Sequence, residues 1–545
     1  MLEMRPSKAI MPQYVKGSAT PSTIRRLTFS AMRIAAAAAY GCAAVIFPAD
    51  LIMLLFIPVF ILIAIILWIM PDRPEFPLSG IQIGFTVTFF LMLVWPSYIA
   101  VVLPGLPWIT PTRLGLLVVT VLFLYSLSTS AKLRRHLALV SRVSPLLWAA
   151  FLLWQAAMIT SMPFSGAISD SLKTFFDNEL RLTQVFFVGC VVFAPRGSAT
   201  KTIKWMLILA LVSAIDGFVE LRLGYPPWAY HIPSFLRIDA TMLEGLLGSQ
   251  ARADDGLYRV RGPYVNALVF SEFLAMCTPF IIHFLMSTRS FAVRISMLCL
   301  WPVIFGTILI TQSRLGIIGT ISSIICYIPF WAYRRWRADG TSLVGPSLLF
   351  GAPLIVLAFV AIVFSSHTLT TRVLGGGAQA ASDAARVEQR QMAIPKIATH
   401  PLGYGLARGA ITLGFYSPSG LLTVDNHYIT TLLDIGVFGA IGFYGMFAVA
   451  VVIGAQIYLK TGDRETELIG PLAIVCLNFL ITKSVLSEEL NHSLAFLLVS
   501  MLLALAARER GLYNADFVLL ISRKDEDRVA NSVAPYLTYR SRRGA

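Results

Sequence analysis

The chain has 545 residues, of which 57% are hydrophobic and only 13% are charged. A soluble domain usually carries about a quarter charged residues, so this composition excludes an ordinary soluble protein. The formal net charge of +15 lies in short segments between apolar runs and at both ends of the chain, which is typical of membrane-protein loops and not of nucleic-acid binding.

Apolar runs long enough to cross a bilayer core of about 30 Å as helices recur along the whole sequence. We expect fourteen such spans and therefore an all-α polytopic membrane protein. The first seven lie near 31–48, 51–70, 81–102, 112–130, 145–161, 178–194 and 203–221. The other seven lie near 265–286, 295–311, 315–332, 345–365, 428–458, 467–484 and 491–507.

Lys and Arg between these runs predict the orientation of the chain. Residues 1–30 form a basic N-terminus that we place in the cytoplasm, residues 31–507 form the transmembrane domain, and the basic tail 508–545 returns to the cytoplasm. Basic segments near 132–135, 289–294 and 334–337 fall on the same side. Two long loops, about 222–264 and 366–427, fall on the other side, the second directly before the twelfth span. Long polar loops between spans are where function tends to lie.

The second long loop contains one predicted helix. Residues Ser382 to Ala393 have an amphipathic pattern, with Ser382 as a plausible N-cap. A residue that precedes proline is disfavoured in helical geometry, so we expect this helix to end near Ile394, before Pro395.

Arginines gather on the predicted outer side, where the positive-inside tendency leads one to expect few. They are Arg259 and Arg261 before the span near 265, Arg314 at a turn between two spans, and Arg372, Arg386, Arg390 and Arg408 in the second loop. For any single one, a salt bridge or headgroup anchoring is the simpler explanation. For the set, we favour anion binding, because guanidinium matches phosphate oxygens in a two-pronged geometry.

A polar cluster lies where the second loop meets the next span. Asp425 and His427 are both candidate general bases for a sugar hydroxyl, because histidine titrates near neutral pH and burial can raise the pKa of a carboxylate. The alternatives are helix capping for Asp425 and an interfacial polar side chain for His427.

Other polar groups give weaker signals. The six cysteines have no metal-ligand spacing, and no cofactor or metal site is expected. The glycines of 403–409 do not follow a strand and are not a nucleotide fingerprint; they indicate a tight turn beside a ligand or a helix end. We interpret Glu488, Glu489 and His492 as a solvated loop, with acceptor binding as the alternative. Aromatic side chains near 228–231 fit an interfacial belt slightly better than a sugar-stacking surface.

Four segments in this order resemble the bacterial O-antigen ligase and O-antigen/exopolysaccharide polymerase superfamily. They are Arg259-Val-Arg261-Gly262-Pro-Tyr, Gln312-Ser313-Arg314-Leu-Gly316, Arg386 followed by Pro401-Leu402-Gly403-Tyr404-Gly405, and Asp425-Asn426-x-Tyr428 followed by Asp434-x-Gly436-x-x-Gly439. The resemblance covers about 250–445. Each motif alone is weak evidence for this superfamily. Their order in the chain and their common position on the predicted outer side are more specific evidence.

The resemblance implies a membrane glycosyltransferase of the bacterial inner membrane that acts at the periplasmic face without a metal or nucleotide cofactor. Its substrates would be an undecaprenyl-pyrophosphate-linked oligosaccharide donor and a glycan acceptor, with a flippase or chain-length regulator as candidate partners. Arg261, Arg314 and Arg386, with Arg259 and Arg390, would bind the pyrophosphate, and Asp425 or His427 would be the base.

One departure from the family pattern bears on the reaction. Ligases typically carry a histidine before the Asn of the last motif, whereas this chain has Asp425 there, which favours a polymerase of exopolysaccharide or O-antigen repeats over a ligase that transfers glycan to lipid A core. A transporter of polysaccharide or lipid-linked sugars would show inverted repeats and mid-membrane helix breaks, for which we see no sequence signal. A receptor or structural membrane protein is less attractive because Arg314 lies at an apolar turn.

Overall fold

The computed structural model describes residues 35, 38–41 and 56–512, apart from 74–76, 103–107, 234, 239–257, 342, 366–379, 418–419, 421 and 488. The first predicted span lies almost entirely outside these residues, and the N-terminal segment 1–30, Arg372, Glu488 and the tail from 513 onward lie wholly outside them. Within the described ranges the regular elements are helical, which confirms the all-α prediction at this level.

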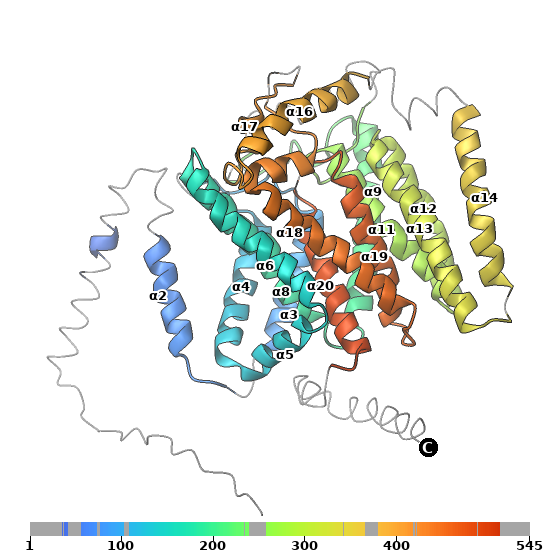
Figure 1. Ribbon diagram of the computed structural model, residues 1–545, viewed down its shortest axis with the longest axis horizontal. Helices are drawn as coiled ribbons and strands as arrows, with labels where there is room; N and C mark the ends of the chain where they lie inside the picture. The colour runs from blue at the N-terminus through green and yellow to red at the C-terminus, as the bar shows by residue number, and fades with distance from the viewer. Residues whose placement is uncertain are drawn as a thin grey trace, which may run out of the picture.

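Helices of the first half follow the predicted apolar runs (Figure 1). They are α2 (Phe56–Ile69), α3 (Leu78–Val94), α4 (Pro111–Thr129), α6 (Pro145–Ser161), a π-helical turn (Glu179–Thr183) that continues into α8 (Gln184–Val192), and α9 (Ser198–Leu223). Two shorter helices, α5 (Ala131–Ser141) and α7 (Ile168–Asn178), lie between them. Thr110 and Ser144 each cap a helix that starts with proline, which explains why α4 and α6 begin where they do.

Helices of the second half are equally close to the prediction. They are α11 (Ala267–Ser287), α12 (Phe291–Ile310), α13 (Arg314–Ala338), α14 (Val344–Ser365), α16 (Ala380–Thr399), α17 (Gly409–Leu413), α18 (His427–Tyr458), α19 (Ile469–Thr482) and α20 (His492–Glu509). Short 3-10 turns precede α7 (Met162–Phe164) and α19 (Thr466–Leu468).

Seven helices in the described residues are long and apolar enough to cross a membrane, namely 111–129, 145–164, 267–287, 291–310, 314–338, 427–458 and 492–509. Two shorter apolar helices, 78–94 and 466–482, accompany them. The number of fourteen spans stays a prediction, as does the assignment of the two sides to compartments.

The core is formed by α11 and α20, whose side chains are buried almost throughout. Helix α11 packs against α9, α12, α13 and α19, and α20 packs against α8, α18 and α19. Helix α18 lies along α6. In Figure 1, α13 and α18 begin at the upper end of this bundle next to α16 and α17, whereas α5 and the start of α12 lie at the lower end. The fold therefore gathers the predicted site elements at one end of the bundle.

Helix α16 ends later than predicted. It continues through Pro395 to Thr399, so the expected end near Ile394 is wrong. Tertiary contacts hold the extra turn: the Lys396 Nζ donates to the carbonyls of Thr412 and Leu413, and the Tyr404 hydroxyl donates to the Lys396 carbonyl. These bonds offset the helical hydrogen bond that proline cannot donate.

Candidate functional site

The segment before α11 is organised by a buried carboxylate. Glu220 of α9 has no exposed surface and accepts hydrogen bonds from the backbone N–H groups of Arg261 and Gly262 and from the Tyr258 hydroxyl. The Arg261 Nε lies 3.8 Å from Glu220 Oε1, and the Arg261 side chain is 4% exposed. The charge of Arg261 therefore faces Glu220, which indicates a positioning role more than direct contact with a substrate.

The segment of Arg259 lies against the turn between α12 and α13, which directly precedes Arg314. The Arg259 Nε donates to the Thr311 carbonyl at 3.3 Å, and Arg314 is the half-buried first residue of α13. The turn is fixed to α11 by a hydrogen bond of 2.8 Å between the hydroxyls of Ser271 and Ser313. This arrangement holds two guanidinium-bearing segments side by side at the upper end of the bundle.

A second group joins α16 to the start of α18. Gln389 of α16 is fully buried, and its Oε1 accepts the Asp425 backbone N–H at 2.9 Å. Arg386 precedes Gln389 by one helical turn and therefore lies on the same face of α16, where it is half-buried. Arg390 is exposed and Asp425 is half-buried. The fold thus brings Arg386 near the backbone of Asp425.

The two glycine motifs, 401–405 and the one that contains Gly436, meet at a break in helix α18. Gly436 has a φ of 72° inside the helix, and the segment from 401 to 405 fills the break. The backbone N–H groups of Tyr404 and Gly405 donate to the carbonyls of Leu433 and Asp434, and Val437 donates to the Pro401 carbonyl. The glycines therefore serve a helix break, as the tight-turn interpretation anticipated.

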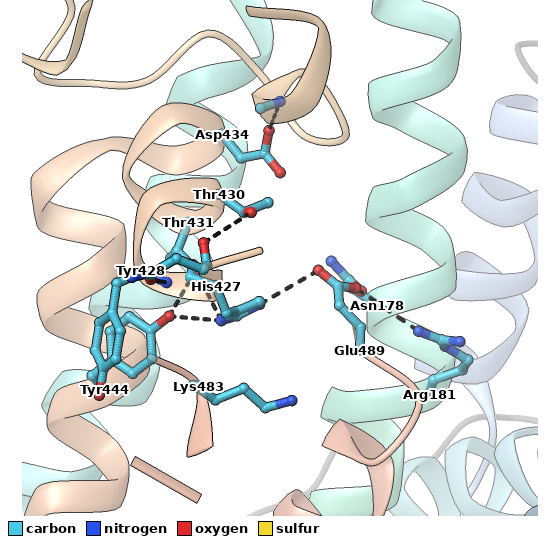
Figure 2. A network of polar contacts seen from close by, with 12 residues as sticks. Asn178, Arg181, His427, Tyr428, Thr430, Thr431, Asp434, Tyr444, Lys483 and Glu489 are labelled. Carbon is cyan, nitrogen blue, oxygen red and sulfur yellow. Dashed lines mark hydrogen bonds and ion pairs between the residues drawn. The ribbon is translucent and has the colours of Figure 1, made fainter. Parts of the chain in front are cut away.

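His427 is buried in the bundle, whereas Asp425 is half-buried. Figure 2 shows its ring between α18 and the loop that precedes α20. Its Nδ1 is 2.6 Å from the Tyr444 hydroxyl and 3.2 Å from the Thr431 hydroxyl, and its Nε2 is 3.7 Å from Glu489 Oε1. The two candidate bases therefore have different surroundings, although they lie only two positions apart in the chain.

Glu489 belongs to a chain of charged side chains that the motifs did not predict. Its Oε2 lies 4.0 Å from Arg181, which pairs with Asp177 at 2.9 Å, and Asp177 pairs with Arg113 at 2.8 Å (Figure 2 shows the Glu489 end). Burial alone would raise the pKa of the Glu489 carboxyl, but His427, Arg181 and Lys483 hold it below its usual value. The spacing of Asp177 and Arg181, one helical turn apart at the edge of an apolar run, was the available sequence signal.

A buried ion pair between Lys483 and Glu272 lies next to His427 in the bundle. The Lys483 Nζ is 3.1 Å from Glu272 of α11, and their side chains are 0% and 1% exposed. The Asn491 amide donates to Glu272 at 2.8 Å, and the Lys483 carbonyl accepts the His427 backbone N–H at 3.0 Å. A glutamate inside a predicted apolar span was the signal for it.

The loop before α20 corrects one expectation. Glu489 and His492 were interpreted as part of a solvated loop, yet His492 is 1% exposed and packs 4.6 Å from the His427 ring, measured between ring centroids. The reason is that α20 lies in the core, so its first residue is covered by α18. Glu489 keeps a partly exposed side chain.

Two cavities adjoin these groups. One of about 30 Å³ is lined by polar residues that include His427, Asp434, Glu489 and His492, and none of the five predicted arginines lines it. The other, of about 310 Å³, is lined by Asp216, Trp228, His231 and Pro263, the last next to the segment of Arg261. Of the five arginines predicted to bind pyrophosphate, Arg259 and Arg314 lie at the α12–α13 turn and Arg386 and Arg390 lie on α16, whereas Arg261 faces Glu220.

Comparison with known protein families gives one match. Residues 295–444 match the family model described as O-antigen ligase, whereas no curated protein matches the chain. The matched segment runs from α12 to the first half of α18 and includes Arg314, Arg386, Arg390, Asp425 and His427. This confirms the resemblance drawn from the motifs over residues 295–444, where the chain is similar to the O-antigen ligase family; the motif that contains Arg259 and Arg261 lies outside the matched segment.

Proposed function

We propose that the chain is a membrane glycosyltransferase that joins undecaprenyl-pyrophosphate-linked oligosaccharide repeats into exopolysaccharide or O-antigen at the periplasmic face of the inner membrane. The observation that carries this proposal is the match of 295–444 to the O-antigen ligase family, with Arg314, Arg386 and Asp425 inside it. The gathering of their elements at one end of the bundle supports a common site.

In this proposal the arginines act on the leaving group. Arg314 and Arg386 bind the pyrophosphate of the donor and stabilise the negative charge that develops as its bond to the anomeric carbon breaks. Arg259 assists at the same turn, and Arg390 lies at the outer edge of the site. Arg261 positions its segment, because its charge already faces Glu220.

Asp425 is the better candidate for the base. A hydroxyl of the acceptor attacks the anomeric carbon of the donor, the new glycosidic bond forms, undecaprenyl pyrophosphate leaves, and the hydroxyl proton passes to the Asp425 carboxylate. Asp425 is half-exposed beside α16, where a sugar can reach it, whereas the His427 side chain is 3% exposed and its Nδ1 is engaged by Tyr444. Proximity of two lipid-held substrates would supply much of the rate.

Ligation to lipid A core is the second candidate, because it uses the same chemistry with another acceptor. The acidic residue at position 425, where ligases typically carry histidine, favours the polymerase. Loss of a polymerase leaves single repeats on the lipid or on the core, whereas loss of a ligase leaves long glycan that is not attached to core.

The test is the glycan made by a strain that lacks this protein and is complemented with variants. Arg314→Ala and Arg386→Ala should abolish polymer at normal protein levels, because the leaving-group charge loses its partners. Arg337→Ala is the matched control, since Arg337 is exposed in the last turn of the same helix as Arg314. Normal polymer from both site variants would overturn the proposed pyrophosphate role.

A further inference from the structure

The small cavity between α18 and α20 is lined by several polar side chains. Its volume is about 30 Å³, and its polar walls include two imidazoles, His427 and His492, two carboxylates, Asp434 and Glu489, and the Asn178 amide. Trp154 and Phe443 are among its apolar walls. A cavity of this size is large enough for an ion or a water molecule.

Three side chains converge as metal ligands do. One ligand atom each from His427, Glu489 and His492 lie within 4.8 Å of one another. The distance of 3.7 Å between His427 Nε2 and Glu489 Oε1 is long for a hydrogen bond. Two ligands bound tetrahedrally to zinc with bonds of about 2.1 Å lie about 3.4 Å apart, so the three ligand atoms, which lie within 4.8 Å of one another, must move closer together by side-chain rotation to close the site.

Two polar atoms at this cavity lack partners. The Nε2 of His492 is buried and has no hydrogen-bond partner among the described residues, and the same holds for the Oδ1 of Asn178 within that part of the chain. These residues are 1% and 7% exposed. Buried polar atoms are nearly always satisfied, so two of them at one cavity indicate something that binds there.

The contacts that hold the proposed ligand side chains in place also fit a metal site. The Nδ1 of His427 lies 2.6 Å from the Tyr444 hydroxyl, which can accept its N–H and leave the lone pair of Nε2 facing Glu489. The second oxygen of Glu489 faces Arg181 at 4.0 Å. Such supporting contacts orient ligands and are a regular feature of metal sites.

The neighbouring cations do not exclude a further positive charge. Lys483 pairs with Glu272 at 3.1 Å, and Arg181 pairs with Asp177 at 2.9 Å. Each therefore has a carboxylate partner apart from Glu489, so the Glu489 charge can balance part of a bound ion.

We propose that His427, Glu489 and His492 bind a divalent transition-metal ion such as Zn²⁺, with a fourth position that faces the cavity. Two imidazoles and one carboxylate are a ligand set that zinc uses. The ion ties the start of α18 to the start of α20 and so supports the segment that carries Asp425. No motif spacing predicts this site, because His427 lies far from the other two ligands in the chain.

The first experiment measures metal in the full-length protein, purified in detergent without chelators and dialysed against micromolar zinc. We expect about one zinc ion per chain. His492→Gln and Glu489→Gln should reduce the bound zinc roughly tenfold or more. His283→Gln is the matched control, because His283 is also a buried histidine of the bundle, bonded to Tyr327, and it should leave zinc unchanged. Wild-type protein without zinc, or equal zinc in all variants, overturns the proposal.

A second measurement covers the case in which the variants do not fold. Co²⁺ added to the wild-type protein should give the visible absorption of a tetrahedral ion, and equimolar Zn²⁺ should displace it. A chelator should also lower the melting temperature of the wild-type protein, because a ligand that binds only the folded state stabilises it. A colourless Co²⁺ sample, or a melting temperature that the chelator leaves unchanged, contradicts the site. Because these tests do not measure glycan synthesis, their failure leaves the proposed function standing.

Discussion

Asp425 and His427 show how two neighbouring side chains acquire different roles. The Asn426 side chain caps α18 by accepting the backbone N–H groups of Tyr428 and Ile429. Asp425 precedes this cap and stays beside α16, whereas His427 is the first helical residue and turns toward α20. One residue is therefore partly exposed beside α16, and the other belongs to a buried network.

Asp425→Asn should lower polymer synthesis by roughly a hundredfold or more, because the amide keeps the size of the carboxylate but cannot accept the hydroxyl proton. His427→Gln should instead lower the melting temperature and change the turnover of the folded fraction by less than about tenfold. The rates of polymer synthesis by the two purified variants, corrected for the amount of folded protein, show which of the two residues is the base. An active Asp425→Asn enzyme together with an inactive, folded His427→Gln enzyme would transfer the role of base to the histidine.

Glu220 makes a separate prediction at the residue scale. Glu220→Ala leaves the buried backbone donors of Arg261 and Gly262 and the partly buried Tyr258 hydroxyl without their acceptor, and each fully buried donor costs about 1–3 kcal/mol. We expect a clear fall in melting temperature. Asp170→Ala is the control, because its pair with Lys173 is exposed and such pairs contribute at most about 1 kcal/mol. Equal melting temperatures of the two variants would contradict this role of Glu220.

At the scale of elements, the break in α18 explains two glycine motifs together. A Cβ on Gly403 would overlap the Asp434 carbonyl, and one on Gly436 would overlap the Pro401 carbonyl. Both residues also have positive φ, which side chains disfavour. The break frees helix carbonyls that the 401–405 segment then uses, so the loop between α16 and α17 is anchored to the bundle.

Gly436→Ala should therefore destabilise the protein and abolish polymer synthesis, because the docked segment would have to move. Gly445→Ala is a matched control on the same helix, since its added Cβ would lie 3.7 Å from the Ala150 Cβ, an ordinary van der Waals contact. Alanine there should be neutral or stabilise the helix by up to about 1 kcal/mol. Melting temperature and polymer yield check both variants, and a stable, active Gly436→Ala protein would show that the break is dispensable.

The pair of Glu272 and Lys483 joins α11 to the end of α19. Lys483→Met leaves a buried carboxylate without its cation and should cost about 3–5 kcal/mol of stability. The double variant Glu272→Gln with Lys483→Met should regain much of this, because no charge remains buried. Thermal unfolding of the two single variants and the double variant measures the coupling, and additive losses would argue against a paired role.

At the scale of the molecule, the bundle separates two sets of charged segments. The helices and turns of the candidate site lie at one end, and α5 and the start of α12 lie at the other (Figure 1). The positive-inside tendency assigns the second end to the cytoplasm. The family match and the apolar helices agree with a multi-pass membrane protein.

Single cysteines test this orientation in a chain from which the six natural cysteines have been removed. Arg390→Cys on α16 should react with an impermeant maleimide in spheroplasts, because its exposed position faces the periplasm in the predicted topology. Arg337→Cys at the far end of α13 should react only after the membrane is permeabilised. The reverse labelling pattern would invert the topology and remove the proposed site from the periplasm.

The sequence alone determined the all-helical membrane class, close positions for thirteen of the predicted helical runs and the family of the segment 295–444. Apolar length, capping residues and motif order are local properties, which is why they can be predicted without a fold. The tertiary structure decided that Arg261 faces Glu220, that α16 passes Pro395, and that His427 meets Glu489 and His492. Each of these depends on which distant segments share a face of the bundle, and helix packing settles that only once the chain has folded.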